Sequence, residues 1–369
     1  MRSNPLKKGH GPDYTFLAIV FLLVVFGLLM LSSASSELGQ QNFHDSYYYL
    51  KHQLTHGLLP GIALFLLLYF IPYRYHQKFA FLMLLVSIVL LALVFTEFGL
   101  RANNAQRWLK FGNFSFQPAE LLKIFFITYL AAWFANPKAG RAKKFYEGFI
   151  PLLIVFAVIA ALLLKQPATS IVVVLIGAGT IVYFSSGTHF RYILALFLIG
   201  VFGLGGLIYF GQGHRLERIV TYLNPGQDVE ETGYHLDKAL TAVGSGRIWG
   251  LGFGNSTIKK SLPARIDDSI FAVIAGEFGF VGAGTLVALF GLLTLKIFWI
   301  AKEMHDRFGE LILIGFGSVI FLQSFFNMAA ISGLVPLTGL PLPFISYGGT
   351  ALATFLAMSG IIANVSRYT

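Results

Sequence analysis

Hydrophobic residues fall in ten runs separated by polar intervals, and each run is long enough to approach or exceed the span of a bilayer as an α-helix. The runs cover residues 14–34, 54–71, 79–96, 117–134, 149–164, 168–185, 190–210, 269–300, 309–332 and 345–365. The fifth and sixth runs are separated only by Lys165-Gln166-Pro167, which predicts a tight helical hairpin because Pro ends one helix and can begin the next. The pattern predicts an all-α, polytopic membrane protein with ten transmembrane helices.

The placement of Lys and Arg residues predicts the orientation of these helices. With the N-terminus inside, the inner loops and ends hold fourteen Lys and Arg residues and the short outer loops hold five. The outer five are Lys51, Arg101, Arg107, Lys110 and Lys165. Because cytoplasmic loops carry the excess of positive charge, we expect both termini in the cytoplasm. The long polar interval at about 211–268 is then outside, within a single membrane domain over 1–369.

Composition supports assignment to the membrane proteins and argues against several kinds of site and ligand. Of 369 residues, 56% are hydrophobic and 12% are charged, whereas soluble domains average about 25% charged residues. The chain has no cysteine, which excludes disulfides, thiol catalysis and Cys-ligated metals. The net charge of +10 follows the inner loops, so it is an orientation signal facing anionic lipid and does not predict nucleic-acid binding.

Two charges lie inside the fourth run. Glu120 and Lys123 are three residues apart and therefore share a helix face. Isolated charges are costly in an apolar segment, so the two are expected to pair. The pair is either a self-neutralising structural feature or part of a functional site, and the sequence leaves both open. Arg107, shortly before this run, adds an outer cation.

The latter part of the long polar interval gathers residue types suited to phosphate chemistry. Five glycines between Gly244 and Gly254 predict tight turns, with diphosphate binding as the lesser alternative. Lys259 and Arg265 follow as candidate phosphate-binding cations. Asp267 and Asp268 then precede an apolar helix that begins at Ser269. These residues suit an ordinary helix N-cap, and a carboxylate there can also serve as a base or a metal ligand.

The interval before the last run breaks helical structure inside a hydrophobic context. Pro336, Pro341, Pro343 and Gly348-Gly349 interrupt it. Such backbone is tolerated at membrane depth where it is buried in protein or lines a cavity. The segment is therefore either a re-entrant packing loop or a substrate contact, for which Ser346 is the candidate residue.

Several motifs in this chain resemble the SEDS family of FtsW, RodA and SpoVE. They are Asn104-Ala105-Gln106-Arg107-Trp108, Phe116-Gln117-Pro118-Ala119-Glu120 with Lys123, Arg218-Ile219 to Asn224-Pro225, Gly233-Tyr234, Gly252-Phe253-Gly254-Asn255-Ser256, Asp268-Ser269-Ile270-Phe271, and Asn327 with Pro341 to Gly349. The resemblance extends over nearly the whole chain in order. Tyr222 to Pro225 and Asp268 to Phe271 favour the FtsW branch.

The resemblance implies a peptidoglycan glycosyltransferase in the bacterial cytoplasmic membrane that polymerises lipid II on the outer face. It implies Asp268 as the catalytic carboxylate, with Glu120 and Lys123 as the paired charges of the family. Arg107, Lys259, Arg265 and Ser346 are our further candidates for substrate binding. A divalent cation, Mg²⁺ or Mn²⁺, is a possible cofactor with Asp268 as a possible ligand, and no organic cofactor is expected. The implied partner is a class B penicillin-binding protein of the division or elongation machinery.

Three positions depart from the pattern of the family. The loop reads Ser261-Leu262-Pro263 where relatives have Tyr-Leu-Pro, and it is one residue shorter. Ala264 and Ala168 stand where relatives usually have acidic residues. Two other functions stay open from the sequence: a flippase for lipid-linked precursors, and a scaffold that only positions a transpeptidase. The acidic pair beside external cations favours the enzyme.

Overall fold

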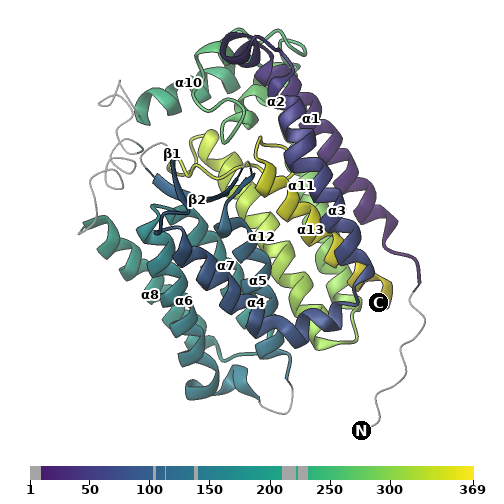
Figure 1. Cartoon of the computed structure of the whole chain (residues 1–369), viewed down its shortest axis with the longest axis vertical. Helices are drawn as coiled ribbons and strands as arrows, with labels where there is room; N and C mark the ends of the chain where they lie inside the picture. Colours follow the sequence, from purple (N-terminus) through teal and green to yellow (C-terminus); the bar gives the residue numbers. More distant parts are fainter. Residues whose placement is uncertain (1–9, 103–104, 113, 137–139, 210–221, 223–231) are drawn as a thin grey trace.

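The computed structural model describes residues 10–102, 105–112, 114–136, 140–209, 222 and 232–369, which form a bundle of helices (Figure 1). The helices of the first half are α1 (Tyr14–Phe43), α2 (Tyr48–Gln53), α3 (Leu59–Phe70), α4 (Tyr73–Leu93), α5 (Pro118–Phe134), α6 (Ile150–Lys165), α7 (Thr169–Ser185) and α8 (Phe190–Tyr209). Those of the second half are α10 (Thr232–Ser245), α11 (Ile270–Glu303), α12 (Arg307–Ile331) and α13 (Gly349–Val365). π-Helical turns at Leu54–Leu58 and Phe145–Phe149 extend α2 into α3 and precede α6.

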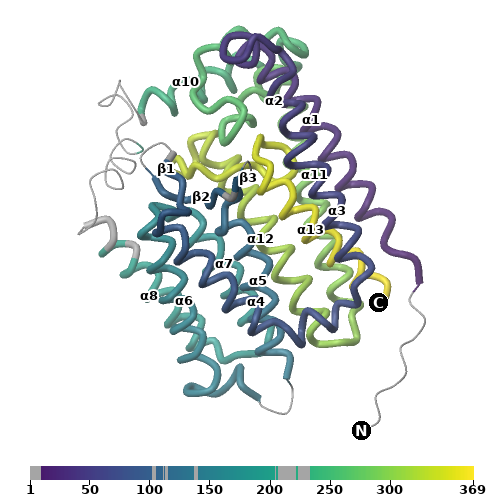
Figure 2. The backbone as a smooth tube through the Cα atoms, in the orientation of Figure 1, coloured from purple at the N-terminus to yellow at the C-terminus, as the bar shows by residue number. Residues whose placement is uncertain are grey.

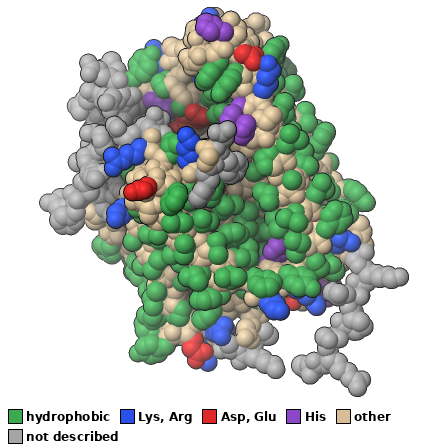
Figure 3. Space-filling model, in the orientation of Figure 1, with side chains coloured by type: hydrophobic (Ala, Val, Ile, Leu, Met, Phe, Trp, Pro, Cys, Tyr) green, Lys and Arg blue, Asp and Glu red, His purple; other side chains and the backbone are tan. Residues whose placement is uncertain are grey.

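Within the described residues, each of the ten predicted runs overlaps a helix. Seven of the described helices are long and apolar enough to cross a membrane, counting α2 with α3 as one. The helices α5 and α7 have 17 residues each, so the number of ten spans stays a prediction. Figure 3 shows a broad hydrophobic band with charged side chains gathered towards the two ends of the molecule, as expected for a protein that spans a bilayer. The Arg218-Ile219 and Asn224-Pro225 stretches and Asn104 lie outside the described residues.

The core of the bundle is formed by α5, α12 and α13 (Figures 1 and 2). In α13, 83% of the most apolar window is buried, against 17% in the span formed by α2 and α3. Small residues allow this close packing: a Cβ atom at Gly360 of α13 would collide with the carbonyl oxygen of Phe65. The peripheral helices keep large apolar side chains on their outer faces, where lipid replaces protein.

A three-stranded antiparallel sheet makes the all-α prediction wrong in one detail. Strands β1 (Gly99–Ala102), β2 (Ala105–Phe111) and β3 (Phe114–Phe116) pair in the order β1-β2-β3. Leu109 of β2 pairs with Phe116 of β3, immediately before α5 begins. The sheet therefore determines where α5, the helix that carries Glu120 and Lys123, begins.

The helix α11 is kinked at Gly279, which has φ 65° and ψ −164°. The loop at 247–252 lies against the kink and satisfies the backbone groups that it frees. The amides of Leu251 and Gly252 donate to the carbonyls of Gly276 and Glu277 at 3.1 and 3.0 Å. The amide of Phe280 donates to the carbonyl of Arg247 at 2.8 Å. Gly279 adopts the positive φ at no steric cost, so the sequence permits a short first segment of α11 directly after Asp268.

Candidate active site

The backbone around the acidic pair is held by residues from distant parts of the chain. Three successive carbonyls accept hydrogen bonds: that of Ile266 from the Tyr347 amide at 2.8 Å, that of Asp267 from Ser346 Oγ at 2.5 Å, and that of Asp268 from Asn327 Nδ2 at 2.7 Å. This segment precedes α11 and has no helical ladder of its own. Side chains and backbone of the C-terminal half therefore determine where the two carboxylates stand.

The irregular loop between α12 and α13 supplies two of these donors. Phe344, at φ 65°, bends the chain into the left-handed region, which non-glycine residues rarely adopt. Ser346 Oγ accepts from the Leu342 amide at 2.7 Å while donating to Asp267. The buried side chain of Gln53 accepts from the Gly348 amide at 3.0 Å. The loop thus packs directly against the acidic pair. Ser346 links the two by its hydrogen bonds to Leu342 of the loop and to the Asp267 carbonyl.

The two acidic side chains have different environments. Asp268 is half-buried, and a Cβ atom at Gly339 would stand 3.7 Å from its Oδ2. Asp267 is open to water on one side and stands among protein atoms on the others. Desolvation by those atoms, followed by repulsion from Asp268, raises the pKa of Asp267 to about 7. The structure therefore places two carboxylates with different solvent access at one site.

The helix-cap prediction for this segment is right in position but not in hydrogen bonding. Ser269 is the N-cap residue of α11, but its side chain makes no capping hydrogen bond. Its Oγ lies 2.6 Å from Nε2 of His235 on α10. This contact ties α10 of the long loop to the residue after Asp268.

Glu120 and Lys123 form the predicted pair, fully inside the protein. Lys123 Nζ donates to both carboxylate oxygens of Glu120 at 2.8 Å and to Gln323 Oε1 at 2.7 Å. Gln323 Nε2 then donates to the carbonyl of Pro341 at 2.8 Å. The side chains of Lys123 and Glu120 are 0% and 2% exposed. The pair therefore reaches the α12–α13 loop, and through it the acidic segment, without presenting a charge to solvent.

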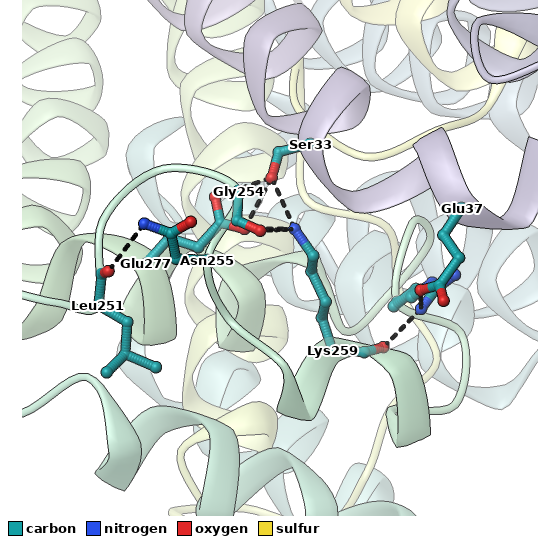
Figure 4. A network of polar contacts seen from close by, with 8 residues as sticks. Ser33, Glu37, Leu251, Gly254, Asn255, Lys259 and Glu277 are labelled. Atoms are coloured by element: carbon teal, nitrogen blue, oxygen red, sulfur yellow. Dashed lines mark hydrogen bonds and ion pairs between the residues drawn. The ribbon is translucent and has the colours of Figure 1, made fainter.

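Lys259 is enclosed in a second buried ion pair (Figure 4). Its Nζ donates to Glu277 Oε1 at 2.8 Å, to Ser33 Oγ at 3.1 Å and to the Gly254 carbonyl at 3.0 Å. An ammonium group has three donors, and all three are used here. These contacts give Lys259 a structural place between α1 and α11, and the phosphate role predicted for it would require breaking them.

Arg265 and Arg107 also contact the protein. Arg265 is buried; its Nη1 donates to the Lys259 carbonyl at 2.9 Å and lies 3.7 Å from Glu37 Oε2. Burial lowers the pKa of Arg265, with Glu37 opposing that shift. On β2, Arg107 is only partly buried and donates to the carbonyls of Gln166 and Pro167 at 2.9 and 2.7 Å. It therefore braces the sheet against the turn between α6 and α7.

The described residues contain no group of three or more His, Cys, Asp or Glu side chains that could hold a metal ion. The acidic segment carries two adjacent carboxylates, Asp267 and the candidate catalytic Asp268. Two carboxylates fit Mg²⁺ only where water and substrate phosphates complete its shell, which is the usual arrangement for this ion.

Comparison with known proteins identifies the family to which this chain belongs. A family profile described as "Cell cycle protein", covering FtsW, RodA and SpoVE, matches residues 13–369. The chain belongs to the FtsW/RodA/SpoVE family. The SEDS resemblance of the motifs is thereby confirmed.

Individual members of the family match over nearly their full lengths. The chain is 37% identical to the probable peptidoglycan glycosyltransferase FtsW of Bacillus subtilis, covering 96% of this chain and 91% of that one. It is 34% identical to stage V sporulation protein E of the same organism, covering 98% and 99%. Among solved structures, the Thermus thermophilus rod shape determining protein RodA superimposes with a TM-score of 0.71 at 28% identity, covering 96% and 97%.

A second solved structure comes from work titled "Structural coordination of polymerization and crosslinking by a peptidoglycan synthase complex". It superimposes with a TM-score of 0.80 at 26% identity and covers 97% of this chain and 99% of that one. The family fold is therefore shared along the chain.

Three amides of the site were not predicted as functional residues: Gln53, Gln323 and Asn327, the last named only through the resemblance. All three are buried. Gln323 and Asn327 are four residues apart, so they lie on one face of α12. A signal existed, because amides in an apolar helix are costly unless hydrogen-bonded. Each of them, however, bonds to backbone groups of the α12–α13 loop, and Asn327 also bonds to the Asp268 carbonyl, which no residue pattern reveals.

Proposed function

We propose that this protein is a peptidoglycan glycosyltransferase that polymerises lipid II into glycan strands. The carrying observation is the Asp268 segment, in which the backbone carbonyls of residues 266–268 accept from three donors of the α12–α13 loop and α12. Membership in the family and relatives named as peptidoglycan glycosyltransferases support the reaction class.

The reaction joins two lipid-linked disaccharides. The 4-hydroxyl oxygen of the acceptor sugar forms a bond to the anomeric carbon of the donor. The bond from that carbon to the diphosphate oxygen breaks, and undecaprenyl diphosphate leaves with the electron pair. Asp268 accepts the proton of the acceptor hydroxyl as general base. Displacement at the α-linked donor inverts it to a β-linkage.

The charge on the leaving diphosphate needs stabilisation by cations. Arg107, which is partly exposed, is the most accessible of the candidate cations. Lys123, Lys259 and Arg265 are buried, so they act on the substrate only if the site opens. A divalent cation held by Asp268 would supply the same stabilisation when bound. No organic cofactor is needed for this chemistry.

The orientation proposed is ten spans with both termini in the cytoplasm and the active site outside. The excess of Lys and Arg in the inner loops supports it. The two ends of the described chain also meet, because the His10 amide donates to the Arg367 carbonyl at 3.1 Å. In Figure 1, α10 lies at the end of the molecule opposite to the C-terminus.

A class B penicillin-binding protein is the proposed partner, as part of the division or elongation machinery. The support is the likeness to a protein solved in a study of a peptidoglycan synthase complex. A lipid II flippase or a non-enzymatic scaffold is the alternative.

One experiment separates the enzyme from these alternatives. Purified protein is incubated with lipid II, with and without the partner, and glycan polymer is measured. We expect polymer from wild type and almost none from Asp268→Asn, because loss of a general base costs about 10²–10⁴-fold in rate. Asp267→Asn is the matched control and should retain substantial activity. Near-normal polymerisation by Asp268→Asn would refute its role as base, and lipid II translocation without any polymer from wild type would favour the flippase.

A further inference from the structure

Asn327 combines deep burial with direct contact to the backbone of the catalytic residue. Its side chain lies on α12 and is 1% exposed. Its Nδ2 donates to the carbonyl of Asp268 at 2.7 Å and to the carbonyl of Leu340 at 2.7 Å. Both partners are acceptors, so the amide nitrogen must face them. One side chain thus joins three elements: α12, the α12–α13 loop and the segment before α11.

We propose that Asn327 is a positioning residue that sets where the Asp268 carboxylate stands. This inference rests on the proposed function, in which Asp268 is the base. The residue acts through the backbone of Asp268 and not on the substrate, so it is not itself a catalytic residue.

The backbone of Asp268 needs an external anchor because it lies outside any regular ladder. Intrahelical bonds of α11 begin only with the carbonyl of its N-cap residue, Ser269. In the preceding turn, the carbonyl of Ala264 accepts hydrogen bonds from the amides of Asp267 and Ser269 at 3.0 and 3.2 Å. The Asp268 carbonyl points away from that turn to Asn327.

The second bond of Asn327 explains why a single amide is used. Leu340 follows Gly339, the residue that faces Asp268 Oδ2. By holding Asp268 and Leu340 together, Asn327 sets the distance between the carboxylate and the loop that lines it. A misplacement of about 1 Å at a reacting group costs on the order of 10²-fold in rate.

Asn364 provides a matched control for the loss of a buried, doubly bonded amide. It is also 1% exposed, and it bridges the Tyr69 carbonyl and the Tyr73 amide. It lies fifteen residues beyond Gly349 on α13, about 22 Å along the helix at 1.5 Å per residue. A substitution there removes the same kind of interaction far from Asp268.

The test compares Asn327→Leu with Asn364→Leu in the full-length chain, using lipid II polymerisation and thermal unfolding. Both variants should unfold at a lower temperature, because each leaves buried backbone groups unsatisfied. At a temperature where both are folded, Asn327→Leu should lower kcat by about 10²-fold and change KM by less than about threefold. The kcat of Asn364→Leu should stay within about threefold of wild type.

Asn327→Asp gives a second readout and keeps the size of the side chain. A carboxyl group donates a hydrogen bond only when protonated. The ratio of its kcat to that of wild type should therefore rise as the pH is lowered from 8 to 6, which a purely structural role does not predict.

The outcomes separate this inference from the proposed function. If wild type polymerises lipid II, Asp268→Asn does not, and Asn327→Leu keeps its kcat, only the positioning role is wrong. The same holds if both Leu variants lose kcat equally. If Asn327→Leu does not fold, a pH-independent ratio for Asn327→Asp overturns the role. Absence of polymer from wild type overturns both proposals.

Discussion

Two buried lysine–glutamate pairs have the same closest nitrogen–oxygen distance and different surroundings. Lys123 and Glu120 are 2.8 Å apart within one helix, and Lys259 and Glu277 are 2.8 Å apart across a loop and a helix. In each pair the ammonium has further protein partners. For Lys123 the further partner is Gln323, whose amide continues to the α12–α13 loop. For Lys259 they are a serine of α1 and a carbonyl of its own loop.

The difference teaches that burial and pairing alone do not indicate function. Removing one member of either pair leaves an uncompensated buried charge, which is strongly destabilising in both places. Only the first pair continues through hydrogen bonds to the segment that carries Asp268. We therefore expect both pairs to affect stability and only the first to affect the chemical step.

The largest effect is expected from Lys123→Met. It leaves the Glu120 carboxylate buried without its cation, which costs about 3–5 kcal/mol of the free energy of unfolding. It also releases Gln323 from its position between Lys123 and the loop, so the kcat of folded protein should fall by about 10²-fold. Polymerisation by folded, purified protein measures this, and an unchanged kcat would make the pair purely structural.

Lys259→Met should lower the free energy of unfolding by about 3–5 kcal/mol as well, because Glu277 is as deeply buried as Glu120. Its folded fraction should retain kcat within about tenfold, since the contacts of Asp268 with α12 are untouched. Thermal unfolding and polymerisation are measured together. A loss of kcat as large as that of Lys123→Met would erase the distinction between the two pairs.

Replacing both members of a pair sharpens the comparison. Apolar residues of similar volume in place of a buried ion pair are often neutral or stabilising by about 1–4 kcal/mol. Glu120→Met with Lys123→Met should therefore recover stability relative to Lys123→Met and still lack activity. Glu277→Met with Lys259→Met should recover both. Activity in the first double variant would show that the charges themselves are dispensable.

The smallest effect concerns Asp267, whose neighbouring charge is another acid rather than a cation. Its pKa of about 7 lies above its ordinary value of 3.8, so the folded state holds this proton more tightly. The contribution of Asp267 to stability is then greatest below pH 4 and is lost as the pH rises towards and through 7. Asp267→Asn should unfold about 1–2 °C higher than wild type at pH 8 and show no gain at pH 4. A gain of equal size at both pH values would contradict the raised pKa.

Much of the bundle follows from local sequence. Ten apolar runs predict the positions of ten helices, because a run of that length in lipid must satisfy its backbone internally. The spacing of Glu120 and Lys123 predicts their pairing, since three residues separate neighbours on a helix face. The prolines and glycines before Gly349 predict irregular backbone there, because they cannot continue a helix. Each of these inferences uses residues within a few positions of one another.

Tertiary structure alone decided the rest of the site. The sequence did not predict Glu277 as the partner of Lys259. The loop and the kink at Gly279 bring these residues together, and their spacing does not correspond to neighbours on a helix face. Asn327 bonds to the backbone of the acidic segment and Gln53 to the backbone of the α12–α13 loop. Every residue carries such backbone groups, and no sequence pattern distinguishes them. Periodicity and spacing encode which face of a helix is apolar, but the choice among identical carbonyls is made only when distant elements pack together.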